Sequence, residues 1–341
     1  MYKKIMGFAV SVILGVTILA GCGKPEAEAP KEETAVNEEA PNNETEAETE
    51  TDSKKPKLVY IAGDMSNESQ VFASKMFAEH AEEYGFEVST LDGRGDPQIQ
   101  AQVVGNAVAQ GADVICINPN DARGIVPSLE AAKKEGVIVG IYGSEIMSDN
   151  PDAARDFYVT QDDIQGGKSA VEVILEKYPD GCNVVEVEGQ AGHDAAIKRH
   201  SGFEENLEGT GINLLASMAP TQWATAEALS ITEDMIIKYG DDIDAIFCHW
   251  DNGATGCIEA LKAANMDDVI VIGIDGCQAG YNQVKAGDQF ATISLDADKL
   301  VRGCMDTARK ILDGEEYSVE NLIGFDLITQ DNIDEFPVPE W

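Results

Sequence analysis

The sequence has few basic residues for its length. Its 341 residues include 24 Lys and Arg against 62 Asp and Glu, which gives a formal net charge of -38. A chain of this charge repels phosphate backbones and anionic lipid headgroups. The composition therefore argues against nucleic acid as a binding partner.

The glycine-rich motifs of nucleotide chemistry are also absent. The first expected strand is followed by Ala62-Gly63-Asp64-Met65-Ser66 in place of G-x-G-x-x-G, and there is no G-x-x-x-x-G-K-[ST]. These loops bind phosphates through backbone N–H groups. We therefore expect no dinucleotide or nucleoside triphosphate, and no other cofactor.

Signatures of a nucleophile, a disulfide framework or a metal site are missing as well. The sequence has no G-x-S-x-G and no C-x-x-C, and Cys116 and Cys248 lie inside apolar runs. Buried free thiols are the favoured interpretation of the cysteines that follow Cys22. His193 and His249 with Cys248 could suggest zinc, but no closely spaced ligand set accompanies them, so we expect no metal.

The N-terminus has the pattern of an export signal. Lys3 and Lys4 precede an apolar run at residues 5–19, which is too short to span a bilayer comfortably. The run ends in Leu19-Ala20-Gly21-Cys22, which resembles the lipobox of bacterial lipoproteins. That resemblance implies a signal peptide at residues 1–22 and a lipid such as palmitate on Cys22. An ordinary signal peptide that ends near a cysteine is the alternative.

Residues 23–56 combine many acidic residues with almost no large apolar side chain. Such a segment cannot bury a core, so it is expected to be a disordered acidic tether.

From residue 57 the sequence alternates between strand-like and helix-like segments. Expected strands lie at residues 58–62, 86–91, 113–118, 137–142, 157–160, 183–187, 213–217, 245–249, 269–274, 290–295 and 322–328. Expected helices lie at residues 70–84, 97–110, 125–135, 167–177, 195–207, 224–238, 253–264 and 299–312. Two βα series of similar length predict an α/β protein with two doubly wound, Rossmann-like lobes and a cleft between them.

Polar and aromatic side chains gather where the strands of the second series end. They are His193, Asp194, Arg199, Trp223, Trp250, Asp251 and Asp275. In open α/β sheets ligands bind at this edge. Carboxylate and guanidinium groups bind vicinal hydroxyls, while an indole covers the apolar face of a ring, so the set suits a small sugar or polyol.

Other interpretations of these residues remain open. Asp251 and Asp275 could simply cap the helices that follow them. Two carboxylates could also serve as the acid and base of a hydrolase, although nothing in the sequence selects a pair at a catalytic separation.

Several stretches together carry a family resemblance: Ala112-Asp113-Val114-Ile115-Cys116-Ile117-Asn118-Pro119, Gly192-His193-Asp194-Ala195-Ala196, Thr221-Gln222-Trp223 and Ile272-Gly273-Ile274-Asp275-Gly276. In their order and spacing they resemble a type I periplasmic binding protein of the ribose and galactose class, in the lipoprotein form that serves ABC transporters. The resemblance runs from about residue 57 to residue 332.

The resemblance implies roles for particular residues. Arg199 matches the family's hydroxyl-binding arginine, Trp223 its ring-stacking aromatic and Asp275 its second-lobe carboxylate. His193 and Asp194 resemble the His and Asp that some hexose binders use. In the first lobe Asn67, with Asp64 nearby, falls where a polar contact is expected.

The sequence also departs from the family pattern. Trp250 stands where sugar binders usually carry Asn, and Leu295 where Asn or Gln is common. Ser69 and Gln70 replace aromatics of the first lobe, and Tyr142 begins the stretch that replaces a polar pair. Trp250 could supply the missing aromatic face from the other lobe.

The resemblance further implies a hinge of three crossings between lobes. We place the N-terminal lobe at residues 57–161 plus 296–322 and the C-terminal lobe at residues 162–295 plus 323–341. The expected protein is a monomeric, non-enzymatic, extracytoplasmic receptor, lipid-anchored to the cell membrane, that delivers its ligand to an ABC permease. A sensor for a membrane signalling partner is the nearest variant, and a secreted carbohydrate hydrolase is the alternative from a different class.

Overall fold

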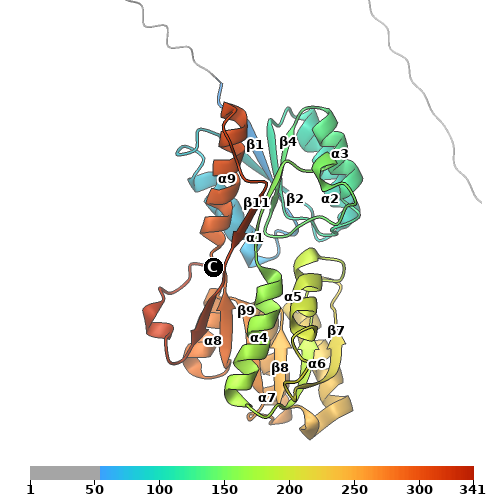
Figure 1. The fold of residues 1–341 in the computed structure, drawn as a ribbon, viewed down its shortest axis with the longest axis vertical. Coiled ribbons are helices and arrows are strands. Elements are labelled where there is room, and N and C mark those ends of the chain that lie inside the picture. The colour runs from blue at the N-terminus through green and yellow to red at the C-terminus, as the bar shows by residue number, and fades with distance from the viewer. Residues whose placement is uncertain (1–53) are drawn as a thin grey trace, which may run out of the picture. The chain divides into compact units, whose positions relative to one another are not determined.

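The computed structural model of the protein describes residues 54–341. The expected signal peptide, Cys22 and most of the expected tether lie outside the described residues. The described part contains two six-stranded sheets, each covered by helices (Figure 1).

The first sheet has the strand order β11-β5-β4-β3-β1-β2 and is parallel throughout. Its strands are β1 (Lys57–Ala62), β2 (Glu87–Asp92), β3 (Val114–Ile117), β4 (Ile138–Tyr142), β5 (Phe157–Gln161) and β11 (Glu320–Ile323). Helices α1 (Glu68–Glu79) and α9 (Ala297–Asp313) pack on one face, and α2 (Pro97–Ala109) and α3 (Val126–Lys134) on the other. Both faces are thus covered, which explains why the central strands are continuous apolar runs.

The second sheet has the order β12-β10-β9-β8-β6-β7, with β12 antiparallel to β10 and the other neighbours parallel. Its strands are β6 (Asn183–Val187), β7 (Asn213–Met218), β8 (Ala245–Cys248), β9 (Ile270–Asp275), β10 (Ala291–Ser294) and β12 (Asp326–Thr329). Helices α4 (Asp163–Lys177) and α5 (Asp194–Glu204) cover one face, and α6 (Thr225–Tyr239) and α7 (Asp251–Ala264) the other. Helix α8 (Gln278–Ala286) lies beside β12.

The chain passes between the two sheets three times, after β5, after β10 and after β11. The predicted doubly wound α/β fold with three crossings is confirmed. Short 3₁₀ turns occur at Pro151–Ala153, Gly240–Asp242 and Ile333–Glu335.

Local sequence explains where several helices begin. The side chains of Asn67, Asp96, Asp162 and Asp296 each accept a backbone N–H at a helix start, and Pro97 opens α2. A short polar residue at this position satisfies a donor that the helix leaves free.

Two features differ from the sequence prediction. Helix α8 was missed, because it is only nine residues long, contains Gly280 and starts without a side-chain cap. The strand expected at residues 322–328 is two strands, since the chain leaves the first sheet after Ile323 and enters the second at Asp326.

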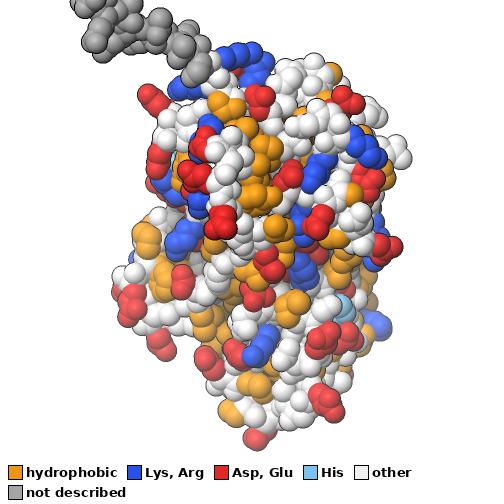
Figure 2. Space-filling view, turned by 45° about the horizontal axis from the view of Figure 1, so that its top comes forward, with side chains coloured by type: hydrophobic (Ala, Val, Ile, Leu, Met, Phe, Trp, Pro, Cys, Tyr) orange, Lys and Arg blue, Asp and Glu red, His pale blue; other side chains and the backbone are white. Residues whose placement is uncertain are grey.

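Five of the cysteines in the described chain are buried, and Cys182 is half-buried; all six are free thiols. No helix within residues 54–341 is both long and apolar enough to cross a membrane. On the face shown in Figure 2, acidic side chains are spread over the surface and interleaved with Lys and Arg. The acidity on this face therefore forms no single charged patch.

Candidate ligand-binding site

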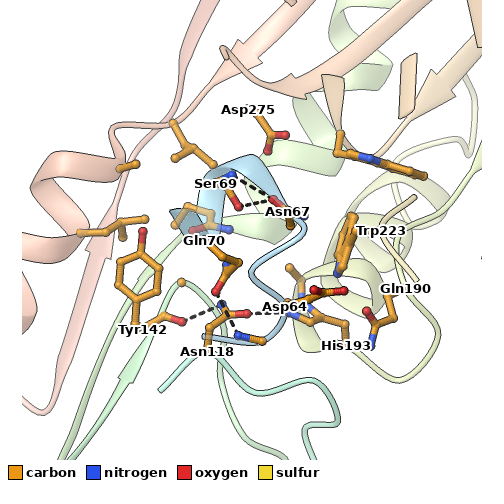
Figure 3. Close-up of a pocket in the computed structure, with 18 of the residues that line it drawn as sticks. Asp64, Asn67, Ser69, Gln70, Asn118, Tyr142, Gln190, His193, Trp223 and Asp275 are labelled. Carbon is orange, nitrogen blue, oxygen red and sulfur yellow. Dashed lines mark hydrogen bonds between the residues drawn. The ribbon is translucent and has the colours of Figure 1, made fainter. Parts of the chain in front are cut away.

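A pocket of about 90 Å³ is lined by residues from both halves of the fold. Its lining consists of Gly63, Asp64, Asn67, Ser69, Gln70, Asn118, Asn120, Tyr142, Gly143, Gln161, Gln190, His193, Ala195, Arg199, Trp223, Trp250, Asp275, Leu295, Ala297 and Leu300. Figure 3 shows Trp223, Gln190 and His193 on one side of this pocket and Tyr142 on the other. A space of this size holds several water molecules, so it suits a small molecule and not a polymer.

The topology explains why these residues meet. Asp64, Asn118, Tyr142 and Gln161 lie at or just after the carboxyl ends of β1, β3, β4 and β5. The second sheet has the same arrangement: His193 follows β6, Trp250 follows β8, and Asp275 is the last residue of β9. Both sheets thus present the edge at which open α/β folds bind ligands.

The structure brings most of the predicted site residues into this lining. They are Asp64, Asn67, Tyr142, His193, Arg199, Trp223, Trp250 and Asp275. Asp194 and Asp251 lie outside it.

Asp194 is directed at the protein itself. Its Oδ2 accepts a hydrogen bond from the backbone N–H of Glu145 at 2.9 Å and lies 2.7 Å from Nζ of Lys198. Glu145 belongs to the first half of the fold and Asp194 to the second. Its carboxylate therefore joins the two halves.

Asp251 is fully buried and shapes the turn next to Asp275. Its Oδ2 accepts from the Gly276 N–H at 2.8 Å and from the Thr292 hydroxyl at 2.7 Å, and its Oδ1 accepts from Gln289 at 2.8 Å. Burial raises the pKa of Asp251 to about 6, against the opposing effect of these hydrogen bonds. The carboxylate is fully buried outside the pocket lining and stabilises the turn.

That turn holds Asp275 in an unusual backbone conformation. The φ of Asp275 is 132°, a region that residues other than glycine rarely adopt. Strain of this kind collects at binding sites, where the surrounding structure imposes it. Burial also raises the pKa of Asp275 well above its usual range, although the Arg199 charge opposes the rise.

Arg199 is buried on the floor of the pocket, with 3% of its surface exposed. Its Nε donates to Oδ1 of Asp163 at 2.7 Å, and its Nη1 donates to the carbonyl of His249. Burial raises the pKa of Asp163, and the adjacent guanidinium opposes that rise. Because these two bonds fix the guanidinium, it can meet a ligand without first being ordered.

Trp223 stands between two other rings. Its centroid lies 5.3 Å from that of His193 and 5.4 Å from that of Trp250, each at an interplanar angle of 89°. The Arg199 guanidinium lies 5.8 Å from the same indole. Edge-to-face contacts of this kind are favourable and fix the ring's orientation.

His193 is held as a neutral ring. Its Nδ1 accepts a hydrogen bond from the Ala195 N–H at 3.3 Å, so the ring proton lies on Nε2, 3.4 Å from Oδ1 of Asn118. Burial and the Arg199 charge lower the pKa of His193 to about 3. The ring is therefore uncharged at neutral pH and joins the two halves of the pocket.

The sequence prediction did not assign the amide side chains of the lining, Gln70, Asn118, Asn120, Gln161 and Gln190. Several of them hold the loops of the pocket. Oε1 of Gln70 accepts from the Tyr60 hydroxyl and the Gly63 N–H, and Nε2 of Gln190 donates to the Asn120 carbonyl. For Asn118, Asn120 and Gln190 the position after a strand was the available signal, but amides in loops are too common for that signal to select them.

Two buried polar atoms of the lining have no partner in the described chain. They are Oε1 of Gln161 and Nε1 of Trp250. A buried polar atom without a hydrogen bond is costly, so other interactions of the fold hold these two side chains in place.

Two doubly wound halves that enclose a small polar pocket define the class of bilobal solute receptors. Residues 58–316 match the family model described as the periplasmic binding protein domain. The chain belongs to this family. It is 32% identical over 255 residues to the ribose import binding protein of Haemophilus influenzae, and the match covers 73% of this chain and 83% of that relative.

Solved structures give the same result for the fold. An ABC transporter solute-binding protein from Mycobacterium smegmatis with bound glycerol is 25% identical, with a TM-score of 0.78 over 84% of this chain and 98% of that chain. One from Bacillus halodurans with bound myo-inositol is 25% identical, with a TM-score of 0.76 over the same shares of the two chains.

The family consists of solute-binding components of transport systems that act outside the cytoplasm and are not enzymes. The predictions of a non-catalytic, extracytoplasmic protein are confirmed.

Proposed function

We propose that this protein captures a small sugar or polyol in the pocket and delivers it unchanged to an ABC permease. The observation that carries the proposal is a small pocket whose lining combines an ordered guanidinium, that of Arg199, with an indole, that of Trp223, and with carboxylate and amide side chains. A polyhydroxylated molecule offers both donors and acceptors for the polar groups, and C–H groups for the ring.

The relatives support this chemistry. The curated relative imports ribose, another relative is a xylitol-binding protein, and the two solved structures hold glycerol and myo-inositol. All four compounds are small and rich in hydroxyl groups.

The test is a thermal-shift screen of pentoses, hexoses, polyols and nucleosides, followed by calorimetry. A ligand that binds only the folded form raises the melting temperature. We expect a pentose or polyol to do so and to be recovered unchanged. A screen in which no sugar or polyol shifts the melting temperature would contradict the proposal, and turnover of any compound would favour a hydrolase.

We further propose that the protein is a monomer anchored by lipid at Cys22, after removal of residues 1–21, and that the lobe boundaries are those given by the sequence. The lipobox-like sequence supports the anchor. Mass spectrometry of the N-terminus from a bacterial host should find an acylated Cys22; an unmodified terminus elsewhere would exclude it.

A further inference from the structure

A buried carboxylate lies beneath the pocket, in the middle of strand β6. Glu186 is fully buried and lies within hydrogen-bond distance of two histidines, His249 and His200. Burying a charge is expensive, and apolar residues often replace a buried ion pair at no loss of stability. Stability alone therefore does not account for Glu186.

The inner of the two bonds leads to His249, which is also fully buried. Nε2 of His249 lies 2.9 Å from Oε1 of Glu186, and Nδ1 accepts a hydrogen bond from the Gly189 N–H at 3.0 Å. Because Nδ1 is an acceptor, the ring proton lies on Nε2 and is donated to Glu186. Both ring nitrogens thus have hydrogen-bond partners, so the ring is held in one orientation.

His249 hydrogen-bonds to the groups that support two pocket residues, Trp223 and Arg199. A Cβ atom at Gly189 would lie 2.0 Å from the Trp223 ring, so the Gly189 backbone is the surface on which this indole lies. The carbonyl of His249 accepts from Nη1 of Arg199. The His249 imidazole therefore fixes the backbone under Trp223, and the main chain of the same residue holds the guanidinium of Arg199.

We infer that Glu186 and His249 are a positioning pair that sets the geometry of Trp223 and Arg199 for ligand binding. Neither residue lines the pocket. The inference rests on the proposed function, in which Trp223 and Arg199 contact the ligand.

The outer side of Glu186 forms a separate cluster. Ligand atoms of Glu186, Glu188 and His200 lie within 4.8 Å of one another. Nδ1 of His200 lies 2.7 Å from Glu186, and the Ser217 hydroxyl lies 2.6 Å from Glu186 and 2.5 Å from Glu188. His200 and Ser217 thus meet the outer oxygen of Glu186, Oε2, and leave the inner oxygen, Oε1, to His249.

The test compares three variants labelled with 5-fluorotryptophan: Glu186→Met, His249→Gln and the control His200→Gln. Each is titrated with whichever of ribose, glycerol and myo-inositol binds the wild type most tightly. The chain has three tryptophans, Trp223, Trp250 and Trp341, so ¹⁹F spectra can be assigned by single Trp→Phe changes.

We expect Glu186→Met and His249→Gln to raise Kd about tenfold, the scale of one lost hydrogen bond to a charged group. The Trp223 resonance should shift or broaden in both while the Trp341 resonance stays in place, which general destabilisation would not produce. His200→Gln touches only the outer side of Glu186, so its Kd and its Trp223 resonance should match the wild type.

The outcomes separate the two proposals. If the wild type binds none of the three compounds and no other sugar or polyol of the screen, the proposed function fails and the positioning role with it. If the wild type binds but folded Glu186→Met keeps Kd within twofold, or loses affinity with an unmoved Trp223 resonance, the positioning role alone is refuted. Glu186→Met removes the acceptor of the His249 bond at nearly the same side-chain length and decides the question if His249→Gln does not fold.

Discussion

Arg199 makes only two hydrogen bonds to the described protein, through Nε and Nη1. Replacing it with alanine removes any ligand contact of the guanidinium and leaves Asp163 and the His249 carbonyl without their partner. We expect Arg199→Ala to weaken ligand binding by about 1.5–3 kcal/mol, the scale of hydrogen bonds to charged groups. Calorimetry with the ligand found in the screen measures this.

Lys198→Ala is the control for that variant. Lys198 is adjacent in sequence, and 30% of its side chain is exposed. Wild-type affinity in Arg199→Ala would show that the guanidinium makes no contribution to binding.

Asp251 differs from Arg199 because it does not line the pocket and acts by holding the turn next to Asp275. Asp251→Asn keeps the size of the side chain but replaces an acceptor oxygen by an N–H₂ group. Because an N–H₂ group donates and does not accept, the Gly276 N–H and the Thr292 hydroxyl lose the oxygen that they share. We expect a loss of about 1–3 kcal/mol in the free energy of unfolding, the cost of leaving a buried donor unsatisfied. Urea unfolding measures it, and an unchanged midpoint would mean that the turn is held by other contacts.

The outcome for these carboxylates shows how far sequence could lead at this scale. Asp194, Asp251 and Asp275 all follow strands near the start of a helix, and for Asp251 and Asp275 the sequence allows either a helix cap or a ligand contact. Only Asp275 lines the pocket. The distinction depends on partners distant in sequence, Glu145 for Asp194 and Gln289 with Thr292 for Asp251, which local sequence does not show.

His200 makes the stability of the protein depend on pH. Its hydrogen bond to Glu186 raises the pKa of His200 from 6.5 to about 9. The folded state therefore holds this proton more tightly than the unfolded state, so the stabilisation is complete below pH 6.5 and is lost as the pH rises through 9.

Glu186 has the opposite dependence. Burial raises its pKa, but the hydrogen bonds from His200 and His249 outweigh burial and lower it from 4.5 to about 2. Its contribution is complete above pH 4.5 and is lost only as the pH falls through 2.

Urea unfolding across the alkaline range tests the effect of His200. The free energy of unfolding should decline less in His200→Gln than in the wild type as the pH rises. An equal decline in both proteins would refute the role given to His200.

At the scale of elements, α4 and α5 approach each other through glycine. A Cβ atom at Gly167 would lie 2.0 Å from the Arg199 carbonyl, and one at Gly202 would lie 2.1 Å from the Ile164 carbonyl. We expect Gly167→Ala to force the helices apart, with a loss of about 1–3 kcal/mol in stability and weaker ligand binding, because Arg199 lies on α5.

Gly105→Ala is the matched control for this helix contact. Gly105 lies inside α2, and nothing lies within 4 Å of its added Cβ. Alanine should therefore stabilise the protein by about 0.5–1 kcal/mol at this position. Equal melting temperatures for the two variants would contradict the role given to Gly167.

The elements themselves were largely predictable, because parallel strands buried on both faces are apolar runs and the helices between them carry caps and periodic patterns. The missed helix α8 and the divided strand at residues 320–329 show where this fails. Helix α8 is short and has no side-chain cap, and the division of the strand depends on which sheet the chain joins, a choice that tertiary packing makes.

At the scale of the molecule, the two halves are joined by hydrogen bonds that do not involve a ligand. The Ala122 N–H donates to the Gly192 carbonyl at 3.3 Å, and Nε2 of Gln190 donates to the Asn120 carbonyl at 3.2 Å. At a separate place, the Trp341 ring stacks on Phe72 of α1 with centroids 5.8 Å apart. These contacts favour the arrangement of the two halves in this structure, here called closed, even before a ligand is bound.

One further hydrogen bond between the two halves involves a charged group, because the Asp194 carboxylate accepts from the Glu145 N–H. A ligand that binds the closed state has an apparent affinity reduced by the fraction of molecules that are open. Asp194→Ala should therefore raise Kd by about three- to tenfold, since the lost bond is worth about 1 kcal/mol net of rehydration. It should also increase the radius of gyration of the unliganded protein in small-angle X-ray scattering.

Lys198→Ala separates this effect from the loss of the adjacent ion pair. It removes the partner 2.7 Å from Oδ2 of Asp194 but leaves the bond to Glu145 in place, so closure should be unchanged. If Asp194→Ala raised Kd without any change in the radius of gyration, Asp194 would affect binding within the pocket and not through closure. The scattering measurement thus distinguishes the ligand-contact role expected from sequence from the interlobe role that its hydrogen bond indicates.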